Sequence, residues 1–314
     1  FSECGRAVYD YVNDCWQPNL RNRAKQTAQP VISYNSIKDV VLRFPPLPEQ
    51  KLIVAILDEV FAGIDDAIAN TEKNLINARE LFESYLDNVF TKRDGKWEQR
   101  KVREISDVVS GHSFKSGDFS ASNSVKSIKI TNVGVREFVS ESENYLPVEF
   151  EKTYRKFSIP KGSIVLALTR SIISTGLKVA VVPDTYDHAL LNQRVAAVKA
   201  HSDRVNNDFL FSYLCTKSVT EYVKGQANTL MQPNLSINDL KNLPIPLPSM
   251  KEQREIVCIL NALSYKTQRL EAIYQQKLTA LNELKQSILQ KAFTGELTAD
   301  TASQAEKVKA DIAA

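Results

Sequence analysis

One segment of the chain occurs twice, 203 residues apart. Residues 29–50, QPVISYNSIKDVVLRFPPLPEQ, align without a gap on residues 232–253, QPNLSINDLKNLPIPLPSMKEQ, with eight identical positions. The same offset continues to Phe90-Thr91 and Phe293-Thr294. An ungapped match of this length indicates one structural unit used twice, so the repeat constrains the fold more than any other feature.

Each copy consists of a proline-rich stretch followed by the pattern of a long helix. Proline lacks an N–H and disfavours the helical conformation in the residue before it, so these stretches end one element. Glu49 and Glu252 then fall in the first turn of a helix, where a carboxylate suits the helix dipole. Residues 53–90 contain no proline and only one glycine, Gly63.

Both helix patterns carry side chains at seven-residue spacing. The first helix has the series Leu57, Ile64, Thr71, Ala78, Tyr85 and the series Phe61, Ile68, Leu75, Phe82, Val89. The second helix, residues 251–293, has Ile256, Leu263, Leu270, Leu284 and Leu260, Thr267, Tyr274, Leu281, Ile288. Sustained heptads predict a coiled coil. The two stripes bury most simply against each other, and a two-fold repeat favours antiparallel packing.

The region between the helices has a different composition. SIKITNV (127–133), SIVLAL (163–168) and LKVAVVP (177–183) predict strands, with turns at 161–163 and 174–176. Residues 207–225 predict one helix that starts near Asp208 and ends at Gly225. The predicted fold class is therefore α+β: a globular α+β domain with two long repeat helices that form an antiparallel coiled coil.

The repeat also divides the chain. The predicted segments are 1–48, the end of a first domain; 49–92, a central helix; 93–248, a second domain; 249–297, a distal helix; and 298–314, a polar tail. The second proline stretch follows a whole domain, whereas the first follows fewer than 50 residues and an N-terminal phenylalanine. We therefore expect most of an equivalent domain to be missing before Phe1.

Composition excludes several classes of protein. The net charge of +3 and a pI of about 8.5 are compatible with nucleic acid, but DNA binding requires a clustered basic face. The four cysteines show no C-x-x-C spacing and are interpreted as reduced thiols, neither a disulfide framework nor a zinc site. No run approaches the ~18 apolar residues of a membrane span.

Motifs of catalysis or cofactor binding are also missing from the sequence. It has no G-x-x-x-x-G-K-[ST], no G-x-G-x-x-G after a strand, no N-P-P-[FY] or D-P-P-Y, and no G-x-S-x-G. His112, His188 and His201 are not at metal-ligand spacing. We expect a chain that is not an enzyme and binds no cofactor or metal.

Several polar segments carry side chains suited to DNA. In SGHSFKSGDF (110–119) the backbone suits approach to a phosphate that Lys115 neutralises, and ALTRSIISTGLK (167–178) offers Arg170 to a guanine. LLNQRVAAV (190–198) has the side-chain amides of Asn192 and Gln193 at the start of a predicted strand, and such amides suit adenine. The loop VKGQANTLMQP (223–233) aligns with the basic loop at 21–30 at the offset of the repeat. The candidates are Ser113, Lys115, Ser116, Arg170, Ser171, Thr175, Lys178, Asn192, Gln193, Arg194, Lys224, Gln226, Asn228, Arg21, Arg23 and Lys25.

Each segment also has a purely structural interpretation. The first is a surface turn with Phe114 and Phe119 packed inward, and the second is a solvated hairpin. Gln193 satisfies buried backbone groups, and the matched loops are helix-to-strand linkers. Trp97, in the basic stretch 92–103 that follows a helix end, is interpreted as a packing anchor.

The layout resembles the DNA specificity subunit of Type I restriction-modification enzymes. The resemblance rests on PPLPEQ (45–50), PSMKEQ (248–253), the stretches at 29–33 and 232–236, and LNELKQSILQKAFTGEL (281–297). SGHSFKSGDF and LLNQRV are similar to pieces of a target-recognition domain. The resemblance implies two such domains, each reading half of a bipartite site in double-stranded DNA, held apart by antiparallel helices.

The resemblance also implies partners and a location. These are adenine-methyltransferase subunits and motor-nuclease restriction subunits in a bacterial or archaeal cytoplasm, with no catalytic site, cofactor or membrane. The chain departs from the family pattern because most of a first recognition domain is absent, so bipartite reading implies pairing of two chains. The alternative is a coiled-coil scaffold that binds protein. Only the DNA reader predicts an affinity that falls with salt.

Overall fold

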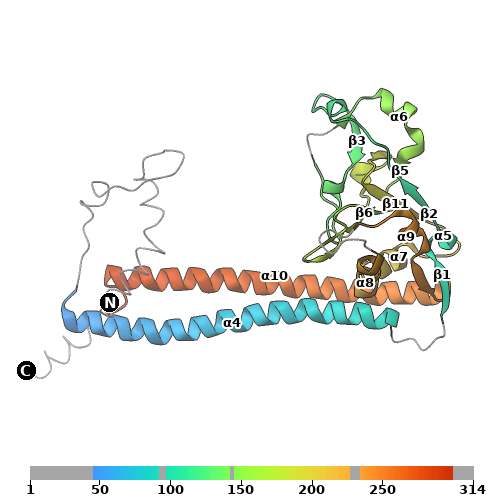
Figure 1. Cartoon of the computed structure of the whole chain (residues 1–314). Helices are drawn as coiled ribbons and strands as arrows, with labels where there is room; N and C mark the ends of the chain where they lie inside the picture. Colours follow the sequence, from blue (N-terminus) through green and yellow to red (C-terminus); the bar gives the residue numbers. More distant parts are fainter. Residues whose placement is uncertain (1–44, 92–96, 142–144, 227–233, 300–314) are drawn as a thin grey trace, which may run out of the picture. The chain divides into compact units, whose positions relative to one another are not determined.

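The computed structural model describes residues 45–91, 97–141, 145–226 and 234–299 (Figure 1). The chain divides into two compact units. The helical unit contains the residues up to Arg79 and from Gln268 onward, and the domain unit is Glu80–Thr267. The predicted segments 1–48 and 298–314 fall almost entirely outside the described residues and stay predictions.

The repeat helices are α4 (Leu47–Thr91) and α10 (Met250–Thr294), 45 residues each (Figure 1). In the helical unit, Ile53 and Leu57 pack in one cluster with Leu289. Further along α4, Asp65 pairs with Lys285 at 2.9 Å and Arg79 pairs with Glu271 at 3.3 Å. As the residue numbers along α4 increase, the residue numbers of their partners on α10 decrease. The two helices therefore run in opposite directions, and the predicted antiparallel packing is confirmed.

The predicted heptads hold over only part of each helix. On α4 the series from Leu57 to Ala78 is buried, but Tyr85 is 37% exposed and Leu86, at 2%, takes its place. On α10 the series Leu260 to Ile288 is buried or half-buried, whereas Leu270 and Leu284 are exposed. An α-helix has 3.6 residues per turn, so a strict seven-residue series drifts off the contact line by about 20° per heptad.

The two copies of the repeat form equivalent hydrogen bonds at the start of each long helix. Gln50 Nε2 donates to the Pro45 carbonyl at 2.7 Å, and Gln253 Nε2 donates to the Pro248 carbonyl at 2.9 Å, at the same offset in sequence. The second copy adds a capping box, in which the Ser249 hydroxyl accepts from the Glu252 amide and the Glu252 carboxylate accepts from the Ser249 amide. In both copies the glutamine therefore bonds the first turn of the helix back to the proline stretch.

Within the described residues, most strands of the domain unit belong to two four-stranded sheets. The first is antiparallel, in the order β2 (Ser106–Ser110), β11 (Val195–Ala200), β6 (Ile164–Ala167), β9 (Val179–Val181). The second has the order β4 (Tyr145–Leu146), β3 (Val125–Ile128), β10 (Ala189–Leu191), β5 (Ser158–Ile159), with β3 and β10 parallel. Two strand pairs accompany them: β1 (Glu98–Lys101) with β12 (Pro244–Leu247), and β7 (Ile172–Ile173) with β8 (Gly176–Leu177).

Apart from the parts of α4 and α10 that belong to it, the described helices of the domain unit are short. They are α5 (Val102–Ile105), α6 (Glu149–Thr153), α7 (Asn207–Leu214), α8 (Lys217–Gln226) and α9 (Ile237–Asn242). Single 3-10 turns are η2 (Ser116–Asp118), η3 (Ile130–Asn132), η4 (Arg155–Phe157) and η5 (Asp184–Tyr186). In the part of the chain described by the structure, every helix is too short or too polar to cross a lipid bilayer.

The predicted strands at 163–168 and 177–183 and both turns are confirmed, but the predicted strand at 127–133 ends at Ile128, because Ile130–Asn132 form η3. The prediction of a single helix over 207–225 is wrong. The chain forms α7 and α8, separated at Cys215 and Thr216. The Thr216 hydroxyl donates to the Tyr213 carbonyl at 2.8 Å and accepts from the Val219 amide at 3.3 Å. A threonine that bonds to the backbone in this way caps a new helix instead of continuing the old one.

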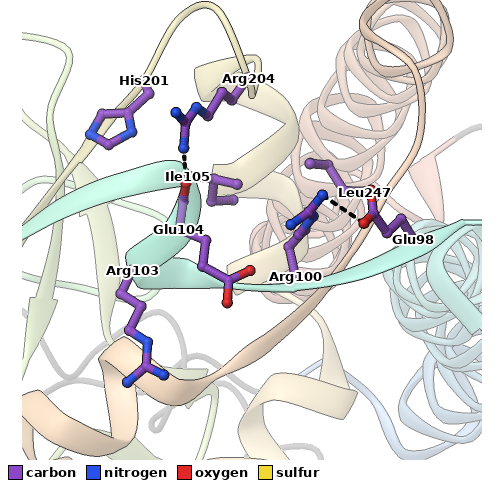
Figure 2. A pocket seen from close by; sticks show the side chains of 8 residues that line it. All are labelled: Glu98, Arg100, Arg103, Glu104, Ile105, His201, Arg204 and Leu247. Atoms are coloured by element: carbon purple, nitrogen blue, oxygen red, sulfur yellow. Dashed lines mark hydrogen bonds and ion pairs between the residues drawn. The ribbon is translucent and has the colours of Figure 1, made fainter.

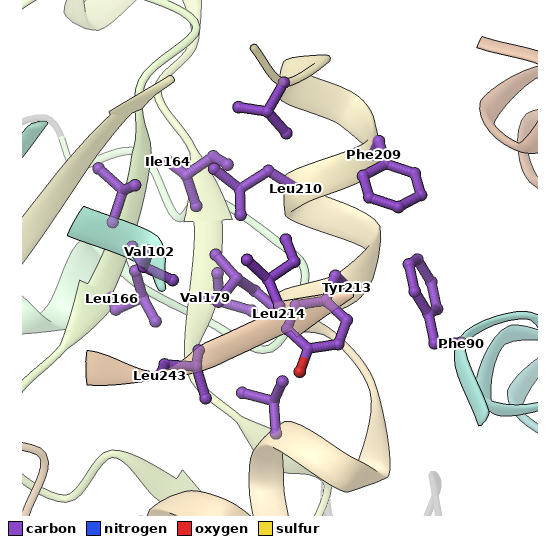
Figure 3. Close-up of a cluster of buried hydrophobic side chains, with 14 of the residues drawn as sticks. Phe90, Val102, Ile164, Leu166, Val179, Phe209, Leu210, Tyr213, Leu214 and Leu243 are labelled. Carbon is purple, nitrogen blue, oxygen red and sulfur yellow. The ribbon is translucent and has the colours of Figure 1, made fainter. Parts of the chain in front are cut away.

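The end of α4 contributes to the core of the domain unit (Figure 3). The Phe90 ring lies 5.2 Å from the rings of both Phe209 and Tyr213. Trp97 meets Phe209 edge-on at 6.3 Å and is buried, as its interpretation as a packing anchor predicts. Burial raises the pKa of Tyr213 to about 12, so its hydroxyl stays neutral and donates to the Pro244 carbonyl at 2.6 Å.

Gln253 joins α10 to this domain. Its side chain is 0% exposed, and its Oε1 accepts from the Asn206 amide at 2.7 Å. We expect Gln253→Leu to lower the free energy of unfolding by roughly 2–4 kcal/mol, because the Asn206 amide and the Pro248 carbonyl lose their partner in a buried place. Urea unfolding of the full chain measures this.

The matched control is Gln276→Leu, at an exposed position of the same helix. Surface substitutions of this kind change stability by about 0.5 kcal/mol or less. Equal unfolding free energies for the two variants would show that Gln253 does not join helix and domain.

Candidate nucleic-acid interface

Several loops meet at one edge of the sheet β2-β11-β6-β9. In an antiparallel sheet, one strand ends where its neighbour begins. Ser110 at the end of β2 lies opposite Ala196, and Ala167 at the end of β6 lies opposite Val195. β9 begins at the same edge, with Val179 opposite Leu166. The residues at this edge, 111–119, 168–178 and 192–194, with 234–235 beside them, are called the loop edge below.

The turn Asn192–Arg194 holds the loop edge together. The Gln193 amide donates to the His112 carbonyl at 2.8 Å, and the Leu168 amide donates to the Arg194 carbonyl at 2.9 Å. The turn is therefore bonded to the loop after β2 on one side and to the loop after β6 on the other. This brings the candidate side chains of 113–116, 170 and 192–194 onto adjacent loops.

Gly111 allows this close approach. A Cβ at Gly111 would lie 2.1 Å from the carbonyl oxygen of Asn192, a distance that no side chain tolerates. The sequence predicts that this glycine-punctuated loop lets the backbone approach a phosphate. The glycine instead lets one part of the chain approach another.

The loop after β2 exposes Ser113, Lys115 and Ser116. Its backbone is fixed because the Lys115 amide donates to the Asp118 carboxylate at 2.8 Å. Phe114 is buried and Phe119 half-buried, so the prediction that both pack inward is confirmed.

An aromatic cluster lies under this loop. Phe114 packs against Phe150 at 6.0 Å, and the His112 ring lies 4.5 Å from Tyr154 and 5.1 Å from Phe157. Sequence reasoning treated His112 only as a polar loop residue. The structure makes it part of the support for the loop edge.

The candidate residues in the loop after β6 differ in exposure. Arg170 is exposed, in a left-handed backbone conformation with φ of 48°. Thr175 is exposed at the turn between β7 and β8. Ser171 is fully buried, and its hydroxyl accepts from the Leu235 amide at 3.2 Å. The prediction that Ser171 meets DNA therefore needs correction, since its side chain is turned inward and supports the loop.

Lys178 is partly buried at the same edge. Its ammonium group donates to the Ile130 carbonyl at 2.9 Å, and burial lowers its pKa. Its charge is thus directed at the protein's own backbone, which makes it a weaker candidate than Arg170.

The remaining candidates lie away from the loop edge or beyond the described residues. Lys224 and Gln226 belong to the last turn of α8, not to a loop as predicted, and Lys224 pairs with Glu221 at 2.8 Å. Asn228, Arg21, Arg23 and Lys25 are outside the described residues.

A hollow of about 630 Å³ lies at the opposite edge of the sheet, where β11 ends and β2 begins (Figure 2). It is lined by Glu98, Arg100, Arg103, Glu104, Ile105, His201, Arg204 and Leu247. Arg100 pairs with Glu98 at 2.6 Å, and Arg204 donates to the Glu104 carbonyl at 2.8 Å. Because two of its three arginines, Arg100 and Arg204, already bind groups of the chain, the hollow is a poorer phosphate site than the loop edge.

The described residues also bear on whether the chain could bind a metal or carry a reactive cysteine. No group of three or more His, Cys, Asp or Glu side chains there is placed to hold a metal ion. Cys215 and Cys258 are free thiols, and burial raises the pKa of Cys215 to about 12, so it is not a reactive thiolate. Cys4 and Cys15 are outside the described residues.

The structure contains an α+β domain and a pair of antiparallel repeat helices, and exposed cations and amides lie on adjacent loops of the domain. The family model for the Type I restriction modification DNA specificity domain matches residues 94–280, more than half of the chain. The chain belongs to this family.

Similar proteins include specificity subunits of Type I restriction enzymes. The specificity subunit of the Type I restriction enzyme MjaVIII of Methanocaldococcus jannaschii is 29% identical over 84% of this chain and 66% of its own length. The EcoBI specificity subunit of Escherichia coli is 24% identical over 90% of this chain and 67% of its own length. The chain thus spans about two thirds of these relatives.

Solved structures share the fold. One is a chain from the study "Structural basis underlying complex assembly and conformational transition of the type I R-M system", with a TM-score of 0.74 and 19% identity over 92% of this chain and 70% of that one. Another is the HsdS subunit from Thermoanaerobacter tengcongensis, with a TM-score of 0.56 and 20% identity over 93% of this chain and 70% of that one.

Proposed function

We propose that this chain is a DNA-reading subunit of a Type I restriction-modification complex and that its loop edge reads half of a bipartite site. The observation that supports this most is the gathering of Lys115, Arg170 and the turn 192–194 on adjacent, mutually bonded loops. The reading edge for the other half-site would come from a second domain, of this protein or of a paired second chain. No catalytic role is proposed, and the site of action would be the cytoplasm.

The proposed roles follow from side-chain chemistry. Arg170 and Arg194 suit the paired acceptors O6 and N7 of guanine, and the amides Asn192 and Gln193 suit N6 and N7 of adenine. Lys115 and the hydroxyls of Ser113 and Ser116 suit phosphates, which fix position but carry no sequence information. Thr175, at the tip of the next turn, would add a phosphate contact.

The long helices are proposed as the surface for the partner subunits. Large hydrophobic side chains are exposed along them: Leu52, Ile76 and Leu81 on α4, and Ile259, Tyr265, Leu270, Ile273 and Leu284 on α10. Exposed apolar side chains grouped on one element commonly mark a protein-binding surface. We propose that adenine-methyltransferase subunits, and through the assembled complex the motor-nuclease subunits, dock there.

Substituting Lys115→Ala and Arg170→Ala together is expected to weaken binding to the cognate duplex by roughly 10–1,000-fold, since a base contact and a phosphate contact are lost. The slope of log affinity against log salt should also fall by about one for the lost phosphate contact. Fluorescence anisotropy of the full chain with a labelled duplex measures both.

The control is Lys101→Ala with Arg103→Ala, which removes the same two residue types near the hollow at the opposite edge. This pair should bind the cognate duplex like the unchanged protein. An unchanged protein without salt-dependent DNA affinity would contradict DNA reading and favour the scaffold alternative.

A further inference from the structure

Asn234 lies beside Arg170 in the loop edge. Its side-chain oxygen Oδ1 accepts a hydrogen bond from the Arg170 amide at 3.2 Å. The next residue, Leu235, donates its amide to the Leu168 carbonyl at 2.9 Å and to the Ser171 hydroxyl at 3.2 Å. Residues 234–235 therefore bond to the chain before Arg170, at Arg170 itself and after it.

Arg170 needs this support because of its backbone. Its φ of 48° is in the left-handed region, which crowds the Cβ of any residue other than glycine. Such a conformation persists only where the surroundings determine it, and it often occurs at functional positions. Here the surroundings are the Asn234 side chain and the buried hydroxyl of Ser171.

The neighbouring residues are fixed by bonds within the sheet edge. The Leu168 amide donates to the Arg194 carbonyl, and the Lys178 amide donates to the Ser171 carbonyl at 2.8 Å. Between these bonds, the Arg170 amide is held by the side chain of Asn234. Loss of that side chain frees the peptide that sets the direction of the guanidinium group.

We propose that Asn234 is a positioning residue that holds Arg170 in the conformation in which it reads DNA. The inference rests on the proposed function. Asn234 lies within the second copy of the repeat but is not one of its identical positions, since position 31 in the first copy is valine. Its role is therefore particular to this recognition domain, and the identity of residue 234 influences which base Arg170 prefers.

The test compares cognate and non-cognate affinity for the full chain. The cognate duplex carries the methylated motif found in the genome that encodes the protein, and the non-cognate duplex has this half-site scrambled. The variants are Asn234→Ala, Asn234→Asp, Arg170→Gly and the double variant Asn234→Ala/Arg170→Gly. Glycine tolerates the left-handed conformation, so Arg170→Gly removes the side chain without backbone strain.

We expect Asn234→Ala to lower the ratio of cognate to non-cognate affinity about tenfold, in the range of one lost base contact. Asn234→Asp keeps the acceptor oxygen, and its charge weakens both affinities alike, so the ratio should remain close to that of the unchanged protein. In the Arg170→Gly background, Asn234→Ala should cause no further loss.

Three results would overturn the inference while DNA reading by this chain stands. In the first, Asn234→Ala leaves the ratio unchanged. In the second, Asn234→Ala lowers the ratio as much in the Arg170→Gly background as alone, which means that Asn234 contacts DNA itself. In the third, Arg170→Gly leaves the ratio unchanged, which means that Arg170 does not read DNA. A ratio of one for the unchanged protein contradicts the proposed function itself.

Discussion

Gly111→Ala is expected to destabilise the domain unit by roughly 3 kcal/mol and to abolish cognate DNA binding. The added Cβ would lie 2.1 Å from the Asn192 oxygen, 2.3 Å from the Asn192 carbonyl carbon and 2.5 Å from the Leu191 oxygen. All three are backbone atoms, so no side chain can rotate away. Overpacking of this kind forces backbone shifts that cost about 1–3 kcal/mol or more.

The same change disrupts the proposed reading surface. The His112 amide donates to the Leu191 carbonyl at 2.8 Å, and the His112 carbonyl accepts from Gln193. If the chain near Gly111 moves away, the loop that carries Lys115 separates from the turn 192–194. Urea unfolding and anisotropy with the cognate duplex measure the two effects.

Gly117→Ala is the matched control in the same loop. A Cβ there meets no atom within 4 Å. Stability should change by about 0.5 kcal/mol or less. If the two alanine variants unfold and bind alike, the close approach of Gly111 to Asn192 does not organise the loop edge.

Arg136→Ala is the second substitution with a large expected effect, a loss of roughly 2–4 kcal/mol in the domain unit. Arg136 donates to both carboxylate oxygens of Glu83 on α4, one of them at 2.7 Å, and to the Cys215 carbonyl at 2.8 Å. Burial alone would lower its pKa, but the hydrogen bond to Glu83 and the attraction of that carboxylate raise it, so the guanidinium stays charged.

The control for this ion pair is on the same helix. Arg79 pairs with Glu271 at 3.3 Å, but its side chain is 59% exposed. Exposed pairs contribute about 1 kcal/mol or less, so Arg79→Ala should have a small effect. Urea unfolding compares the two. An Arg136→Ala variant as stable as Arg79→Ala would mean that the ion pair does not stabilise the packing of the segment around Arg136 against the end of α4 within the domain unit.

The long helices were predictable because their signals are local. The proline stretches, the glutamates in the first turns and the apolar spacing depend on residues close in sequence, and the repeat supplied the packing direction. The heptad pattern wrongly predicted Tyr85 and Leu270 to be buried, because burial along a long helix is not a local property. Which side chain faces a partner depends on helix geometry summed over several turns, and a seven-residue count does not carry that information.

The candidate site was predictable as a set of loops and less so as a set of side chains. Polar residues after a buried strand, such as Arg170 after β6, mark a sheet edge. The inward turn of Ser171, the role of Gly111 and the bond from Arg170 to Asn234 all depend on segments far apart in the sequence. The position of Gly111 next to a histidine in a polar loop is a local signal that this glycine has a structural role. The sequence around Asn234 contains no such signal.

The most direct test of the central claim is to map methylated adenines by long-read sequencing in the organism that encodes this chain, with and without its gene. The proposed function predicts that deletion removes methylation from one bipartite motif and that restoring the gene restores it. An unchanged methylation pattern after deletion would contradict the claim that this chain directs a restriction-modification complex to its DNA site.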